Sequence, residues 1–228
     1  MSSYYYSLDN YLENDKMQIA DFLRIATQLC KKLYEIHKKN ILVGHLSPSI
    51  ILINESKNIK IDQLNLNKDD TQNNVYRSPE QIITSNLKVS TSSDIYSLGI
   101  VFFKMLTGEL PYSYNNSLEF SHIIATTKIP LLSNIDKNIP VILSKVVDKM
   151  ISKNQFDRYS DILSVYTDLF RIEQNNKKYN KFIDFEIDTL QKFHKSTKLY
   201  GREREEETIV RATKRKAKTL YSLKEISV

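Results

Sequence analysis

The sequence has few of the residues that mark several classes of protein. A single cysteine, Cys30, excludes an internal disulfide and a cysteine-rich metal site, and its apolar periodic surroundings favour a buried thiol. Only 4 glycines and 5 prolines argue against collagen-like or low-complexity structure. No apolar run reaches the ~18–20 residues that cross a bilayer, and the N-terminal residues lack a signal-peptide pattern. These absences predict an intracellular, cytoplasmic protein without a membrane span.

The residues that are present suit a globular protein with a mild basic excess. Of 228 residues, 41% are hydrophobic and 26% charged, which is enough to build and solubilise a core. The net charge of +6 suits an acidic partner, or it serves solubility alone. The basic run at 211–218 has no interleaved aromatic residues, so a solvated helix face is favoured over nucleic-acid or lipid binding.

Hydrophobic periodicity predicts a mostly helical chain. The most apolar segment, 94–106, is too continuous for a solvated face and therefore predicts a buried helix, with Ser92 or Ser93 as N-cap and Gly108 as its stop. The other expected elements are an amphipathic helix at 17–39, strands of a hairpin at 50–53 and 58–61, a polar irregular stretch at 63–91, and helices at 117–126, 139–152, 160–174 and 201–223.

One stretch carries a chemical signature. Residues Ile41–Ile53, which read ILVGHLSPSIILI, resemble the catalytic loop of a protein kinase, roughly IVHRDLKPxNILL. The apolar residues that seat such a loop are kept. The residues that move a phosphoryl group in kinases are replaced. His45 stands in place of the loop Asp, Ser47 in place of the Lys, Ile50 in place of the Asn and, further along, Gln63 in place of the Asp of Asp-Phe-Gly.

Other motifs extend this resemblance over about residues 7–210. They are Ser78–Glu80 for Ala-Pro-Glu, Asp94–Gly99 with Leu106–Tyr112 for the central helix and its exit, Asn154–Arg158 for the late arginine motif, and Lys198–Glu205 for the entry to an ATPase module. The last motif is similar to that of hybrid sensors, which join a serine/threonine kinase-like domain to an ATPase, a GAF domain and a histidine kinase. No phosphate loop follows it, so the ATPase itself is expected to be absent.

The resemblance implies a fold and a division of the chain. The expected fold is mainly α: a kinase-like C-terminal lobe, a helical bundle with one or two small β-hairpins, without the N-terminal lobe and with a partly helical C-terminal tail. Residues 1–174 are expected to form the lobe, truncated at its N-terminus. Residues 175–200 would be a linker, and 201–228 a charged helical tail resembling the start of the ATPase module.

The replaced residues imply an inactive member of the kinase family. Magnesium in a kinase is held by the Asp of Asp-Phe-Gly and the loop Asn, and neither Gln63 nor Ile50 supplies an anionic oxygen. No metal, cofactor or catalytic residue is therefore expected, and His45 is interpreted as a surface or half-buried loop histidine. The chain is predicted to be a pseudokinase fragment that acts as a binding or scaffolding module. The alternatives are a divergent serine/threonine kinase and a truncated paralogue without independent function.

Three residues are expected to keep structural roles that the resemblance implies. Glu80 and Arg158 would form a buried ion pair, and Asp94 would anchor the loop backbone near Gly44 and His45. Without a cleft roof, apolar surface is expected to be exposed and to offer a site for another protein. The residues expected on that face are Leu12, Leu42, Leu52 and Leu64.

Overall fold

The computed structural model describes residues 4–12, 16–62, 71–83, 88–113 and 116–179, together with residues 182 and 187. The chain divides into two units, Met1–Thr189 and Leu190–Val228, and every described residue belongs to the first. The helix expected at 201–223 lies outside the described residues, as does Leu64.

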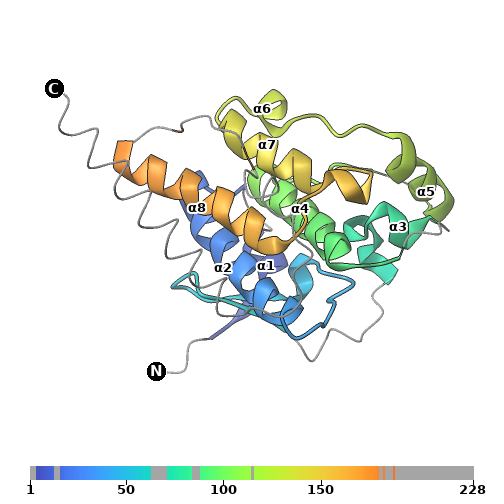
Figure 1. The fold of residues 1–228 in the computed structure, drawn as a ribbon, viewed down its shortest axis with the longest axis horizontal. Coiled ribbons are helices and arrows are strands. Elements are labelled where there is room, and N and C mark those ends of the chain that lie inside the picture. The colour runs from blue at the N-terminus through green and yellow to red at the C-terminus, as the bar shows by residue number, and fades with distance from the viewer. Residues whose placement is uncertain are drawn as a thin grey trace, which may run out of the picture. The chain divides into compact units, whose positions relative to one another are not determined.

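Helix α4, Thr91–Thr107, runs through the centre of the first unit (Figure 1). Its side chains are buried almost all round, as the apolar sequence predicts. The helix ends at Gly108, whose φ of 82° is the left-handed conformation that a C-terminal stop requires. The predicted N-cap was wrong by two residues or more. Ser90 has an extended backbone and its hydroxyl accepts from the Ser92 amide, because Ser92 itself already lies inside the helix.

Helices α2, Ile19–His37, and α8, Ile162–Tyr179, pack side by side along the same flank of the unit (Figure 1). Phe22 of α2 meets Phe102 of α4 edge to face, with ring centroids 5.2 Å apart. Cys30 is fully buried in α2, as predicted.

Helix α8 continues five residues beyond its predicted end at 174. Lys177 pairs with Glu173 across one helical turn at 2.5 Å, which supports the polar last turns. The division of the chain at 174 stays a prediction, because the helix end does not by itself mark a domain border.

A small antiparallel sheet has the strand order β1-β2-β3, with β1 at Tyr6–Ser7, β2 at Ile51–Ile53 and β3 at Ile59–Ile61. The hairpin of β2 and β3 was predicted, and its register pairs Leu52 with Lys60. Strand β1 was not predicted, because two residues are too few to show an alternating pattern.

Shorter elements complete the unit. They are α1 (Leu8–Leu12), η1 (Pro48–Ile50), η3 (Thr71–Tyr76), α3 (Pro79–Ile82), α5 (Ser117–Thr126), α6 (Leu132–Ile135), α7 (Val141–Met150) and η4 (Gln155–Asp157). The irregular structure expected for 63–91 is wrong at η3 and α3. Helix α3 forms because Ser78 and Gln81 make a reciprocal capping box around Pro79.

Gly99 allows α4 to approach the end of α7 closely. A Cβ on Gly99 would lie 2.6 Å from Cγ2 of Ile151 and 2.9 Å from Cβ of Met150. No helix among the described residues has the length and apolar character needed to cross a membrane. The predicted fold class, mainly α with a small β-hairpin component, is confirmed.

Candidate functional site: the loop between α2 and β2

A single buried carboxylate holds the loop that follows α2. Asp94, 1% exposed, accepts hydrogen bonds from the amide of Val43 at 2.9 Å and from the amide of Gly44 at 2.7 Å. Its Oδ2 also lies 2.8 Å from Nε2 of His37, at the end of α2. One side chain of α4 thereby fixes the helix end and the loop backbone together. Asp94 therefore lies against the loop backbone near Gly44, the position predicted from its place in the sequence.

His37 was missed by sequence reasoning. The sequence shows a basic residue in the last turn of a predicted helix, which ordinarily indicates only a favourable contact with the helix dipole. Its partner, Asp94, is 57 residues away, and no local pattern joins the two.

The loop has a second anchor at Gly44. The side-chain amide of Gln81 donates to the Gly44 carbonyl, so α3 and α4 hold the two successive peptide groups that meet at Gly44. Gly44 has a φ of +77°, a backbone conformation in which most other residues would be strained. Gln81 also accepts from the backbone and hydroxyl of Ser78, which fixes its side chain in place.

The replaced kinase positions lie within this well-anchored loop. Ser47 is buried and its hydroxyl lies 2.7 Å from that of Ser49. Ile50 is 6% exposed and its side chain belongs to the hydrophobic core, while its carbonyl accepts from the Asp62 amide at 2.8 Å. His45 is half-buried. Gln63 lies outside the described residues.

The Ile50 side chain supplies no ligand to a magnesium ion. Magnesium needs oxygen ligands in near-octahedral geometry, and an isoleucine packed in the core offers none. Across the described ranges, no group of three or more His, Cys, Asp or Glu side chains is arranged to hold a metal ion.

Glu80 and Arg158 form a bidentate ion pair. Nη1 and Nη2 of Arg158 lie 2.7 Å and 2.8 Å from the two carboxylate oxygens of Glu80, and both side chains are almost wholly buried. Burial by itself would raise the pKa of Glu80. The hydrogen bonds and charge of Arg158, with the hydroxyl of Ser93, outweigh it and hold that pKa below its ordinary value. The structure brings these two predicted residues together.

Arg158 also satisfies backbone carbonyls from two segments. It donates to the carbonyls of Ser92 at 3.1 Å, Ser152 at 2.8 Å and Lys153 at 3.1 Å. Its guanidinium lies 4.9 Å from the ring centroid of Tyr96. Arg158 therefore joins the start of α4 to the loop after α7 through these backbone hydrogen bonds, in addition to its ion pair with Glu80.

Lys153 stands next to this cluster. Its ammonium donates to the hydroxyl of Tyr112 and lies 4.6 Å from the centroid of that ring. Burial, and then the positive charge of Arg158, lower the pKa of Lys153 to about 8.

The apolar face expected from Leu12, Leu42 and Leu52 is only partly exposed. Leu42 is 41% exposed and Leu52 is half-buried. Leu12 is a correction: it is 6% exposed, because α1 turns both of its leucines into the core against η1 and β2.

The central buried helix, the loop tied to its aspartate and the glutamate–arginine pair together define a helical lobe of the protein-kinase type. The family model described as "Protein kinase domain" matches residues 3–170, and the chain belongs to the protein kinase family. The predicted resemblance to a kinase-like domain is thereby confirmed.

Individual relatives agree with this assignment. A probable serine/threonine-protein kinase of Clostridium acetobutylicum is 28% identical over 72% of the chain, and the probable serine/threonine-protein kinase PknB of Lactococcus lactis is also 28% identical over 72%. Hybrid signal transduction histidine kinase G of Dictyostelium discoideum is 30% identical over 67% of the chain. The match spans 26%, 28% and 5% of these three relatives, in the same order.

Proposed function

We propose that this kinase-family domain does not transfer phosphate and acts as a binding or scaffolding module. The observation that carries the proposal is Ile50, whose buried aliphatic side chain stands where the family places a magnesium-binding asparagine. The loop around Ile50 is anchored by Asp94 and Gln81. The loop is therefore well formed but carries other side chains than the catalytic ones of the family.

The chemistry of phosphoryl transfer explains why this replacement weighs heavily. The reaction depends on positioning and on neutralising the charge of the phosphates, which metal ions supply in kinases. Ile50 has no donor atom, Gln63 offers a neutral amide, and Ser47 replaces the loop lysine. A base at His45 would contribute about 10²- to 10⁴-fold, which does not replace a metal site.

A retained framework without catalytic groups suits a protein that binds other proteins. The three ties through Asp94, Gln81 and Arg158 keep the lobe rigid, and rigid elements position a binding surface well. Leu42 on the anchored loop is 41% exposed and is a proposed contact for a partner protein.

The names of the relatives favour a second candidate. Two of them are probable serine/threonine-protein kinases, so a divergent enzyme that phosphorylates proteins with ATP is the competing function.

Magnesium–ATP titration separates the two candidates. A working site with ligand at about 100 times its Kd stabilises the fold by about 2.7 kcal/mol. For a protein of this size that shift corresponds to a rise in melting temperature of about 5–10 °C. We expect no such rise with 5 mM magnesium–ATP, and no incorporation of labelled phosphate into the chain or a general protein substrate. A rise that disappears on chelation of magnesium with EDTA would establish the enzyme instead.

A further inference from the structure

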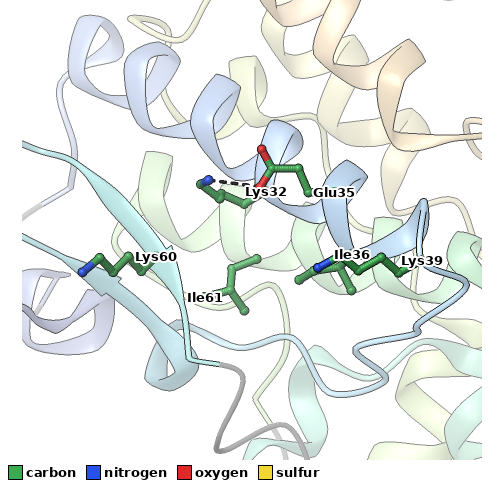
Figure 2. Close-up of a pocket in the computed structure, with 6 residues that line it drawn as sticks. All are labelled: Lys32, Glu35, Ile36, Lys39, Lys60 and Ile61. Atoms are coloured by element: carbon green, nitrogen blue, oxygen red, sulfur yellow. Dashed lines mark hydrogen bonds and ion pairs between the residues drawn. The ribbon is translucent and has the colours of Figure 1, made fainter.

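A pocket of about 230 Å³ lies between the C-terminal half of α2 and strand β3 (Figure 2). Its lining reaches the start of the anchored loop at Lys39 but contains none of the loop residues that Asp94 and Gln81 hold. Its lining consists of Lys32, Glu35, Ile36, Lys39, Lys60 and Ile61.

The pocket combines an apolar floor with a basic rim. Ile36 is part of the core and Ile61 packs partly buried against it, so both present carbon atoms to the pocket. Figure 2 shows Lys32 of α2 above Ile61, Lys39 just beyond the end of α2 to the right of Ile61, and Lys60 extending away to the left. The ammonium of Lys60 lies 4.0 Å from the centroid of the Tyr5 ring.

The lining carries a net positive charge. Three lysines and one glutamate give the lining residues a net charge of +2. Glu35 pairs with Lys32 at 3.1 Å, and the two side chains are 61% and 45% exposed, so this pair is worth little and rearranges easily. An anion entering the pocket therefore meets more positive than negative charge.

Strand β3 adds backbone groups to the same side. The bonds from Asp62 to Ile50 and from Asn54 to Asn58 fix which residues of the ladder face β2. Because bonded pairs alternate along an antiparallel ladder, Lys60 bonds toward β2 while Ile61 turns its N–H and C=O to the edge. The edge faces α2, since the neighbouring outward amide, that of Ile59, donates to the Gln28 side chain at 3.3 Å.

We propose that this pocket binds an acidic linear peptide of a partner protein. An apolar side chain of the peptide rests on Ile36 and Ile61, its flanking carboxylates meet Lys32 and Lys39, and its backbone lies beside the outward-facing edge of Ile61. Charge complementarity selects this occupant, because a basic or neutral peptide would leave the net positive charge of the rim unneutralised. The inference rests on the proposed role as a binding module and names the chemistry of one partner.

A labelled peptide tests the proposal directly. The probe is fluorescein-labelled Glu-Glu-Leu-Glu-Glu, titrated with the full chain and followed by fluorescence anisotropy at low salt. We expect saturable binding that weakens when salt rises from 0.05 to 0.5 M, because exposed charges are then screened. Replacing the peptide leucine with alanine should weaken binding by about tenfold through lost apolar burial.

Protein variants locate the site. Lys32→Glu/Lys39→Glu should weaken binding by about tenfold or more, whereas Lys128→Glu/Lys137→Glu makes the same charge change at exposed positions elsewhere and should change it less than twofold. Glu35→Gln should tighten binding two- to threefold, since it removes the one acid in the pocket.

Equal losses in the two double variants would mean that only the net charge of the chain attracts the peptide, and the pocket would be refuted. Absence of any binding to the intact chain would refute it as well. Both outcomes leave the nucleotide titration unaffected, so failure of this site is distinguishable from failure of the proposed inactive state. Circular dichroism of each variant checks that the helices are retained.

Discussion

Removing Arg158 should destabilise the lobe far more than removing an exposed cation. The change Arg158→Met keeps much of the side-chain volume but leaves the Glu80 carboxylate buried without its cation, with the Ser93 hydroxyl still donating to it. Breaking a buried ion pair by deleting one partner costs about 3–5 kcal/mol. Folded domains are stable by only about 5–15 kcal/mol, so this loss is a large share of the total.

Urea denaturation followed by circular dichroism measures the effect. With a slope of about 2 kcal/mol/M, a loss of about 4 kcal/mol moves the midpoint down by about 2 M. The matched control is Lys177→Met, which removes an exposed helix pair with Glu173 and should cost about 0.5 kcal/mol or less. Glu80→Gln placed in the Arg158→Met background should recover part of the loss, because it removes the buried charge. The backbone carbonyls that Arg158 served would still lack a donor.

The pH dependence gives an independent check of the reasoning. In the natural protein the pKa of Glu80 is held below its ordinary 4.5, so its stabilisation is present above that pH and is lost as pH falls through the lowered pKa. Without Arg158, burial raises the pKa of the same carboxyl, and the variant gains stability relative to the natural protein as the group becomes protonated. The difference between the two proteins should therefore shrink from pH 7 to pH 4.5. A loss below about 1 kcal/mol, or a difference that stays constant over this range, would refute the ion-pair argument.

Three further predictions concern other parts of the lobe. Asp94→Asn should increase amide hydrogen exchange at Val43 and Gly44, because the two amides donate to different carboxylate oxygens and asparagine keeps only one acceptor oxygen; unchanged protection by NMR would contradict the anchor. Gly99→Ala should lower stability by about 1–3 kcal/mol in urea titration, since the added methyl collides with the end of α7; a stabilised variant would show that α7 shifts freely. Because the pKa of Lys153 is about 8 in the folded protein and 10.5 ordinarily, stability should rise from pH 8 toward 9.5 relative to Lys153→Met; parallel pH curves of the two proteins would argue against this lowered pKa.

Elements with a long repeating pattern could be predicted from the sequence. The apolar run of α4 and the amphipathic period of α2 gave both helices within a few residues, and Gly108 gave the correct stop. The hairpin of β2 and β3 followed from two apolar stretches around a polar turn. Strand β1 was not predicted because it is defined by its pairing with β2. The two strands are more than 40 residues apart, and such pairing produces no local sequence pattern.

The candidate site could be predicted in its chemistry and less in its geometry. Motif positions identified Ile50, Glu80 and Arg158, because the residue type at each position carries the information. The contacts of His37 and Gln81 depend on how α2, α3 and α4 pack together in the fold. The spacing of residues along the chain does not predict that packing. The exposure of Leu12 was wrong for a similar reason, since the direction in which α1 turns its leucines is set by η1 and β2.

The polar ties described above join distant parts of the chain, which bears on the order of folding. Gln81 and Gly44 are 37 residues apart, Val43 and Asp94 are 51 apart, and Glu80 and Arg158 are 78 apart. Contacts that close such long loops form late on the folding path, after the local helices. Substitutions at these ties should therefore accelerate unfolding and leave the refolding rate nearly unchanged, so these contacts govern how long each folded molecule persists.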